Sequence, residues 1–155
     1  MSLINFFGYI GEFDIKVKEN QVITEEHHIN NRITDVALNK IINILDNIDP
    51  DLDIKYIAIG TSNAPINDSD TQLGAEIWRG QPISSVNNAT GQFVTNFTVL
   101  DSEAVGDWEE IGIFCGDAAT GTANTGTMLS RILFSRTKTA LEEIEVSRTD
   151  RVVRN

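Results

Sequence analysis

Apolar and polar residues alternate along several short segments of the chain. Residues 13–17 place Phe, Ile and Val between charged residues, which is the period of a strand with one buried face. Residues 93–99 alternate in the same way, and compact apolar runs cover 54–59 and 108–115. Turn-forming residues recur between these segments at a spacing of about ten residues, so the pattern predicts a mainly β domain, either an antiparallel sandwich or a barrel-like fold.

One segment, residues 34–48, has a helical period instead. Thr34 or Asp35 can cap its start, and Asp49-Pro50 can end it, because proline cannot continue a helix. The apolar residues of the segment recur at the i, i+3, i+4 and i+7 positions of one face and are Leu38, Ile41, Ile42, Leu45 and Ile48. We therefore expect an amphipathic helix that packs on the sheet.

The length of 155 residues suits one compact domain, with an N-terminal segment of different character. Residues 1–33 are interpreted as a hairpin or as an arm that docks on a partner, and these alternatives remain open. Residues 34–155 are expected to form a single β-rich domain with its covering helix. Residues 148–155 read as a polar tail.

The acidic composition narrows the function classes. Twelve Lys and Arg against 23 Asp and Glu give a formal charge of −11, which disfavours binding to nucleic acid and to anionic lipid. No segment reads as a signal peptide or a transmembrane span, so the chain is expected to stay in the cytoplasm where it is made. The single cysteine, Cys115, lies in an apolar run and is expected to be buried and inert.

Candidate metal sites are weak. His27 and His28 are adjacent in an extended segment, so their side chains should point to opposite faces and not chelate one ion. Asn67 to Asp70 resembles a calcium loop only loosely, and Asp70 is expected to cap a short turn through Leu73. We predict no metal and no cofactor.

Catalytic constellations are not apparent either. The carboxylate pairs Glu109-Glu110 and Glu142-Glu143 are adjacent strand residues, which diverge, so we expect a solvated edge or an intersubunit contact. The glycine-rich loop 116–126 lacks the residues of a phosphate-binding loop. We therefore predict that the chain is not an enzyme. Trp78 and Trp108 are the residues singled out as possible ligand or interface contacts.

Residues 53–147 contain several motifs in a fixed order. The motifs are Gly60-Thr-Ser-Asn-Ala-Pro65, Asp70-Thr-Gln-Leu-Gly-Ala-Glu76 with Arg79, Glu103-Ala104, Trp108-Glu-Glu-Ile-Gly-Ile-Phe114, Gly126-Thr-Met-Leu-Ser-Arg-Ile-Leu-Phe134 and Lys138-Thr139. Their succession resembles a domain common in tail, fibre and baseplate-associated proteins of tailed bacteriophages. Ser62 departs from that pattern, which usually has a second glycine there, and Ile113 stands where leucine is common.

The resemblance implies a structural protein of a virion. The expected partners are further copies of the chain, as a homotrimer or another symmetric oligomer, and neighbouring virion proteins. Two alternatives remain: a receptor-binding module whose loops 61–70 and 116–126 hold a host surface glycan, and a capsid decoration or head-fibre protein. In each case the expected location is the virion, assembled in the bacterial cytoplasm.

Overall fold

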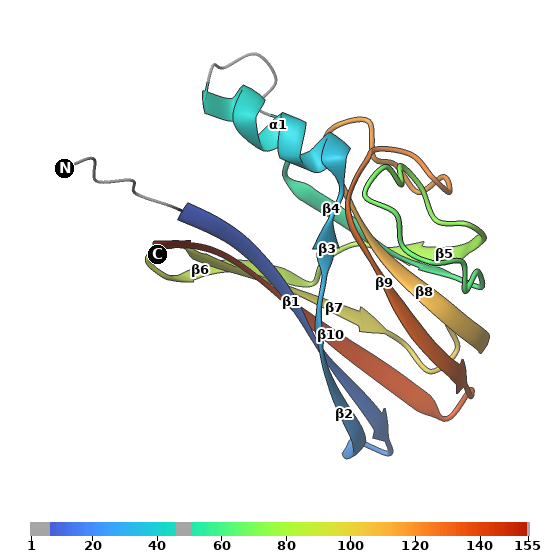
Figure 1. Cartoon of the computed structure of the whole chain (residues 1–155). Coiled ribbons are helices and arrows are strands. Elements are labelled where there is room, and N and C mark those ends of the chain that lie inside the picture. The colour runs from blue at the N-terminus through green and yellow to red at the C-terminus, as the bar shows by residue number, and fades with distance from the viewer. Residues whose placement is uncertain (1–6, 46–50, 155) are drawn as a thin grey trace.

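The computed structural model describes residues 7–45 and 51–154, which form two antiparallel sheets of five strands each and one helix (Figure 1). The elements in chain order are β1 (Phe7–Glu19), β2 (Val22–Asn30), β3 (Arg32–Ile33), α1 (Asp35–Leu45), β4 (Ile54–Gly60), β5 (Glu76–Gly80), β6 (Ser84–Ala89), β7 (Gln92–Val99), β8 (Gly106–Cys115), β9 (Thr127–Lys138) and β10 (Glu142–Arg154). The predicted mainly β sandwich is confirmed. Within the described residues, no helix is both long and apolar enough to cross a membrane.

The strand order shows how the chain moves between the sheets. Sheet A has the order β2-β1-β10-β7-β6 and sheet B the order β3-β9-β8-β4-β5. The chain passes from sheet A to sheet B between β2 and β3 and again between β7 and β8. It returns from sheet B to sheet A between β5 and β6 and between β9 and β10. In the described residues, the sheet edges are therefore β2 and β6 in sheet A, and β3 and β5 in sheet B.

The N-terminal segment forms a hairpin within sheet A. Asn20 and Gln21 both have positive φ, at 50° and 67°, as a two-residue hairpin turn that matches the strand twist requires. On its other side, β1 pairs with β10 continuously from Phe7 opposite Arg154 to Glu19 opposite Glu142. The structure thus shows a hairpin over residues 7–30, with β1 as an inner strand of the sheet. Docking of the N-terminal segment on a partner stays a prediction.

The core lies between the two sheets. Sheet A contributes the alternating residues Phe13, Ile15 and Val17 of β1, while β8 contributes Ile111 and Ile113. Thr95, Phe97 and Val99 of β7 are also buried, as their alternation predicts. Cys115 is buried as expected, and its burial raises the pKa of the thiol to about 12.

The helix begins as predicted but packs differently. The Thr34 hydroxyl accepts a hydrogen bond from the Ala37 amide at 3.2 Å, so Thr34 is the N-cap. The hydroxyl also donates to the Met128 carbonyl, which fixes the first turn against β9. Ala37 is buried, and Ile41 is half-buried and lines a cleft together with Leu129 of β9. Leu38, Ile42 and Leu45 are exposed, so the described part of the predicted apolar stripe is only partly covered. Ile48 and Asp49-Pro50 lie outside the described residues.

Two local predictions are wrong. Residues 71–76 form bends and the start of β5, not a helical turn. Residues 148–154 are not a polar tail but the second half of β10. The polar sequence is compatible with this strand because the buried Arg148 is paired with other side chains of the sandwich.

Candidate functional site

Two loops cover the outer face of sheet B, the face turned away from sheet A. The first loop spans residues 61–75 between β4 and β5, and the second spans 116–126 between β8 and β9. Leu73 of the first loop is wholly buried in a small apolar cluster with Ala58, Phe114 and Met128. A Cβ atom on Gly112 would lie 2.8 Å from a Leu73 methyl carbon, so only glycine lets Leu73 pack this close to β8.

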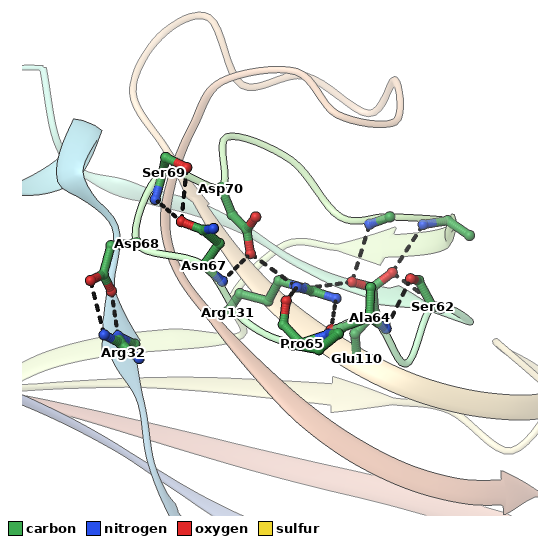
Figure 2. A network of polar contacts seen from close by, with 12 residues as sticks. Arg32, Ser62, Ala64, Pro65, Asn67, Asp68, Ser69, Asp70, Glu110 and Arg131 are labelled. Carbon is green, nitrogen blue, oxygen red and sulfur yellow. Dashed lines mark hydrogen bonds and ion pairs between the residues drawn. The ribbon is translucent and has the colours of Figure 1, made fainter.

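The first loop is held by the buried carboxylate of Glu110 on β8 (Figure 2). Its Oε1 accepts the amides of Ser62 at 3.3 Å and Ala75 at 3.0 Å, and its Oε2 accepts the Gly74 amide at 3.2 Å. One carboxylate thus binds both ends of the loop. Since the side chain is 0% exposed, these backbone amides replace the water that a carboxylate otherwise needs.

Arg131 on β9 completes this network. Its Nε donates to Glu110 Oε2 at 2.7 Å, and its Nη1 donates to Asp70 Oδ2 at 2.9 Å. Its Nη2 donates to the Ala64 carbonyl at 3.0 Å. Figure 2 shows the guanidinium lying between the two carboxylates, with the middle of the loop wrapped around it. We call Glu110, Arg131 and Asp70 the loop clamp.

The loop clamp corrects two predictions. Asp70 was expected to cap a turn through Leu73, but it instead accepts the preceding Asn67 amide at 3.0 Å and pairs with Arg131. Glu110 was expected at a solvated edge or an intersubunit contact, but it is fully buried within the chain. A buried, hydrogen-bonded ion pair fixes geometry more than it adds stability, so the clamp serves mainly to hold one loop conformation.

The second loop is fixed by an ion pair on β5. Glu76 and Arg79 pair through two hydrogen bonds, Nε to Oε1 at 2.6 Å and Nη2 to Oε2 at 2.8 Å. Arg79 also donates to the Thr120 carbonyl at 2.8 Å, while Glu76 accepts the Asn124 amide at 2.8 Å. The guanidinium lies over the Phe114 ring at 4.5 Å. Both loops are therefore anchored to sheet B by buried charge.

A second buried polar network lies between the sheets. Arg148, which is wholly buried, donates to Asp150 through Nε and Nη2 and to the Ser130 hydroxyl through Nη1. The Tyr9 hydroxyl also donates to Asp150. Burial is the main cause that raises the pKa of Tyr9, so its hydroxyl stays protonated at neutral pH. This network joins β1, β9 and β10.

A cleft of about 730 Å³ opens beside this network, at the end of the sandwich near α1. Ile41 of the helix, Leu129 of sheet B and Val152 of sheet A contribute apolar surface, and Tyr9 and Asp150 contribute polar groups. A cavity of this size and character is typical of ligand sites. The polar groups at its base are, however, already paired with Arg148, so they offer little unsatisfied chemistry to a ligand.

The two tryptophans have different environments. Trp108 is 0% exposed and its Nε1 donates to the Ala104 carbonyl at 2.7 Å, so the prediction that it contacts a ligand or partner is wrong for the folded chain. The apolar ring fills the core beside Phe134 instead. Trp78 on β5 is half-buried, packs at the margin of the core, and stays a candidate contact.

The histidines and the loop acids are engaged with neighbouring side chains. His27 contacts the ring of Phe134 with centroids 5.2 Å apart, whereas His28 pairs with Asp14 at 2.8 Å. The two imidazoles thus point to opposite faces of β2, as expected. In the loosely calcium-like segment, Asp68 pairs with Arg32 and Asp70 with Arg131, so arginines already neutralise both carboxylates.

Sequence reasoning missed one acidic cluster. The carboxylates of Asp51, Asp53 and Asp117 approach within 4.8 Å of one another. Lys55 lies 2.6 Å from Asp53, and the Asp117 amide donates to Asp51 at 2.8 Å. A lysine and a backbone amide therefore offset part of the negative charge.

The charged residues of the loop clamp all belong to the ordered motifs, but the motifs alone do not indicate that these residues meet. Their signal was present, because Glu110 and Arg131 each interrupt an apolar strand whose neighbours are buried. A charge at such a position needs a partner. Glu142 of the second predicted pair behaves alike, since it is buried and pairs with Arg136 at 2.6 Å.

Comparison of the chain with protein-family models, with curated proteins and with solved structures finds no match.

Proposed function

We propose that the protein is a structural component of a tailed bacteriophage or phage-like particle, in the tail, baseplate or fibre region, which acts through contacts with further copies of itself and with neighbouring virion proteins. The supporting observation is the convergence of the ordered motifs. Motif residues distant in sequence, among them Asp70, Glu110 and Arg131, meet in one buried clamp that fixes a loop on the outer face of sheet B.

A fixed loop surface suits an assembly protein. Association is weakened by the entropy of ordering flexible segments, so a loop whose conformation is already set loses less on binding. The loop clamp and the Glu76–Arg79 pair hold both loops in this way, with buried charges that favour one arrangement. The two loops form the surface on which we place the contacts with neighbouring virion proteins.

Particle composition tests this proposal. Particles would be purified by density gradient from a host strain that carries the gene, and the chain measured by mass spectrometry in each fraction. We expect it to co-sediment with particles at a fixed ratio to the major virion proteins, and a deletion strain to produce defective particles. A chain confined to the soluble fraction, with normal infectious particles from the deletion strain, would refute the proposal. Immunogold labelling of the head instead of the tail would favour a capsid decoration or head-fibre protein.

A receptor-binding module is the second candidate. The exposed parts of the two loops are rich in hydroxyl and amide side chains, including Thr61, Asn63, Thr122 and Asn124, which are groups that bind sugars. Binding of labelled protein to host cell-wall polysaccharide tests this alternative. Loss of binding in Asn63→Ala and Thr122→Ala, with unchanged thermal stability, would support it, whereas equal binding by the variants would count against it.

A further inference from the structure

The four sheet edges in the described residues differ in how they are protected. An edge strand presents unpaired backbone groups, which natural proteins shield with charges, short length or a covering segment. β2 carries Glu25 and Glu26, and β3 is only two residues long. β5 carries the Glu76–Arg79 ion pair. The remaining edge, β6, has none of these charges.

β6 lies in an uncharged part of an otherwise acidic chain. No Asp, Glu, Lys or Arg occurs from Gly80 to Leu100, which includes both β6 and its partner β7. Every residue of β6 is exposed, and Val86 is 50% exposed beside Val94 on the outer face of sheet A. Figure 1 shows β6 at the margin of sheet A, and no described strand pairs with its outer side.

Charge decides which surfaces two copies can bring together. Each chain carries a formal charge of −11, so most faces of two copies repel each other at low salt. The β6–β7 hairpin carries no charged side chain, so this repulsion is weak there, and the backbone donors and acceptors on the outer side of β6 lack a partner strand in the described residues. An extended strand satisfies such groups best, and the β6 edge of a second copy offers the same uncharged strand.

We propose that β6 pairs antiparallel with β6 of a second copy across a twofold axis, so that two sheets A join into one continuous sheet. A strand paired antiparallel with itself gives a closed, self-complementary interface. The Val86 side chains of the two copies then lie near the axis and add an apolar contact on the outer face. This inference deepens the self-association in the proposed function and names the surface that carries it.

The oligomeric mass of matched variants tests the interface. Sedimentation velocity or light scattering of the full chain should give a concentration-dependent mass approaching twice 17.1 kDa. Val86→Lys places two like charges near the axis and should raise the dimer dissociation constant at least about tenfold. Val22→Lys is the matched control, because Val22 is 64% exposed on the charged edge β2, and it should leave the constant unchanged.

Cross-linking provides a second measurement that does not depend on weakening the dimer. Cys115 is wholly buried, so Val86→Cys supplies the one accessible thiol and should form a covalent dimer with a short bismaleimide, whereas Val22→Cys should not. A wild-type monomer at about 100 µM, a trimer, a dimer unaffected by Val86→Lys, or equal cross-linking at both positions would each overturn the interface. The particle-composition experiment measures the presence of the chain in particles separately. A result that overturns the β6 interface therefore does not by itself refute the proposed structural role.

Discussion

Neutralising the carboxylate of the loop clamp should destabilise the protein strongly. In the wild type each oxygen of the Glu110 carboxylate accepts two hydrogen bonds, from Ser62 and Ala75 on Oε1 and from Gly74 and Arg131 on Oε2. Glu110→Gln replaces one of these oxygens by an NH₂ group. In either orientation of the amide, this NH₂ donor then faces two N–H donors that have lost their acceptor. Arg131, 3% exposed, also keeps a buried charge with one fewer partner.

The expected loss follows from these contacts. Breaking a buried ion pair by removing one charge typically costs about 3–5 kcal/mol. A domain of this kind has a total unfolding free energy of about 5–15 kcal/mol, so the variant should stay folded but melt roughly 10 °C lower. Urea unfolding followed by tryptophan fluorescence gives the free energy, and hydrogen exchange should show faster exchange of the amides in 61–75.

Two controls separate the clamp from a general effect of charge removal. Glu109→Gln changes the adjacent, half-buried carboxylate and should alter the free energy of unfolding by less than about 0.5 kcal/mol. In a double-mutant cycle, Glu110→Gln and Arg131→Met should be non-additive by about 2 kcal/mol, because both remove the same pair. A loss below about 1 kcal/mol for Glu110→Gln, or additive effects, would refute the role assigned to the clamp.

Three further outcomes are expected. Arg79→Lys keeps the charge but loses the paired geometry, so hydrogen exchange in 116–126 should accelerate at least about tenfold, with no such change if the loop is held by other contacts. Burial raises the pKa of Cys115 from its ordinary value of 9.0 to about 12. The thiol therefore contributes its full stability below pH 9.0 and loses it as the pH rises toward 12, so urea titrations over this range should show a smaller decline in Cys115→Ala. The hydrogen bond with Asp14 raises the pKa of His28, so NMR titration should find a higher pKa in the wild type than in Asp14→Asn, and equal values would contradict the pairing.

The inner strands β1 and β7 could be predicted from the sequence because each has one buried face. Phe13, Ile15 and Val17 alternate with charged residues, and the structure buries all three. The helix shows the limit of the same reasoning. Periodicity identifies the apolar face of Leu38, Ile42 and Leu45, but it carries no information on whether another element covers that face. In α1 the stripe is covered only in part, since Ile41 is half-buried whereas Leu38, Ile42 and Leu45 are exposed.

The site could not be predicted for a different physical reason. Whether Glu110 is solvated or buried depends on Arg131, on the next strand, and on backbone amides contributed by both ends of a loop. These groups come together only when β8 and β9 pair and the loop folds over them. The sequence motifs mark the residues that take part, but the pairing between them is a property of the tertiary structure.

The pairing of β1 with β10 has a consequence for the order in which the protein folds. These strands are neighbours in sheet A, yet the residues they pair, such as Ile15 and Val146, are far apart in sequence. During synthesis β1 lacks its partner strand until residues 142–154 have left the ribosome, and the apolar face of β1 is exposed to solvent until then. Nascent chains are therefore most prone to aggregate before β10 appears, and sheet A, β6 included, is completed only after it.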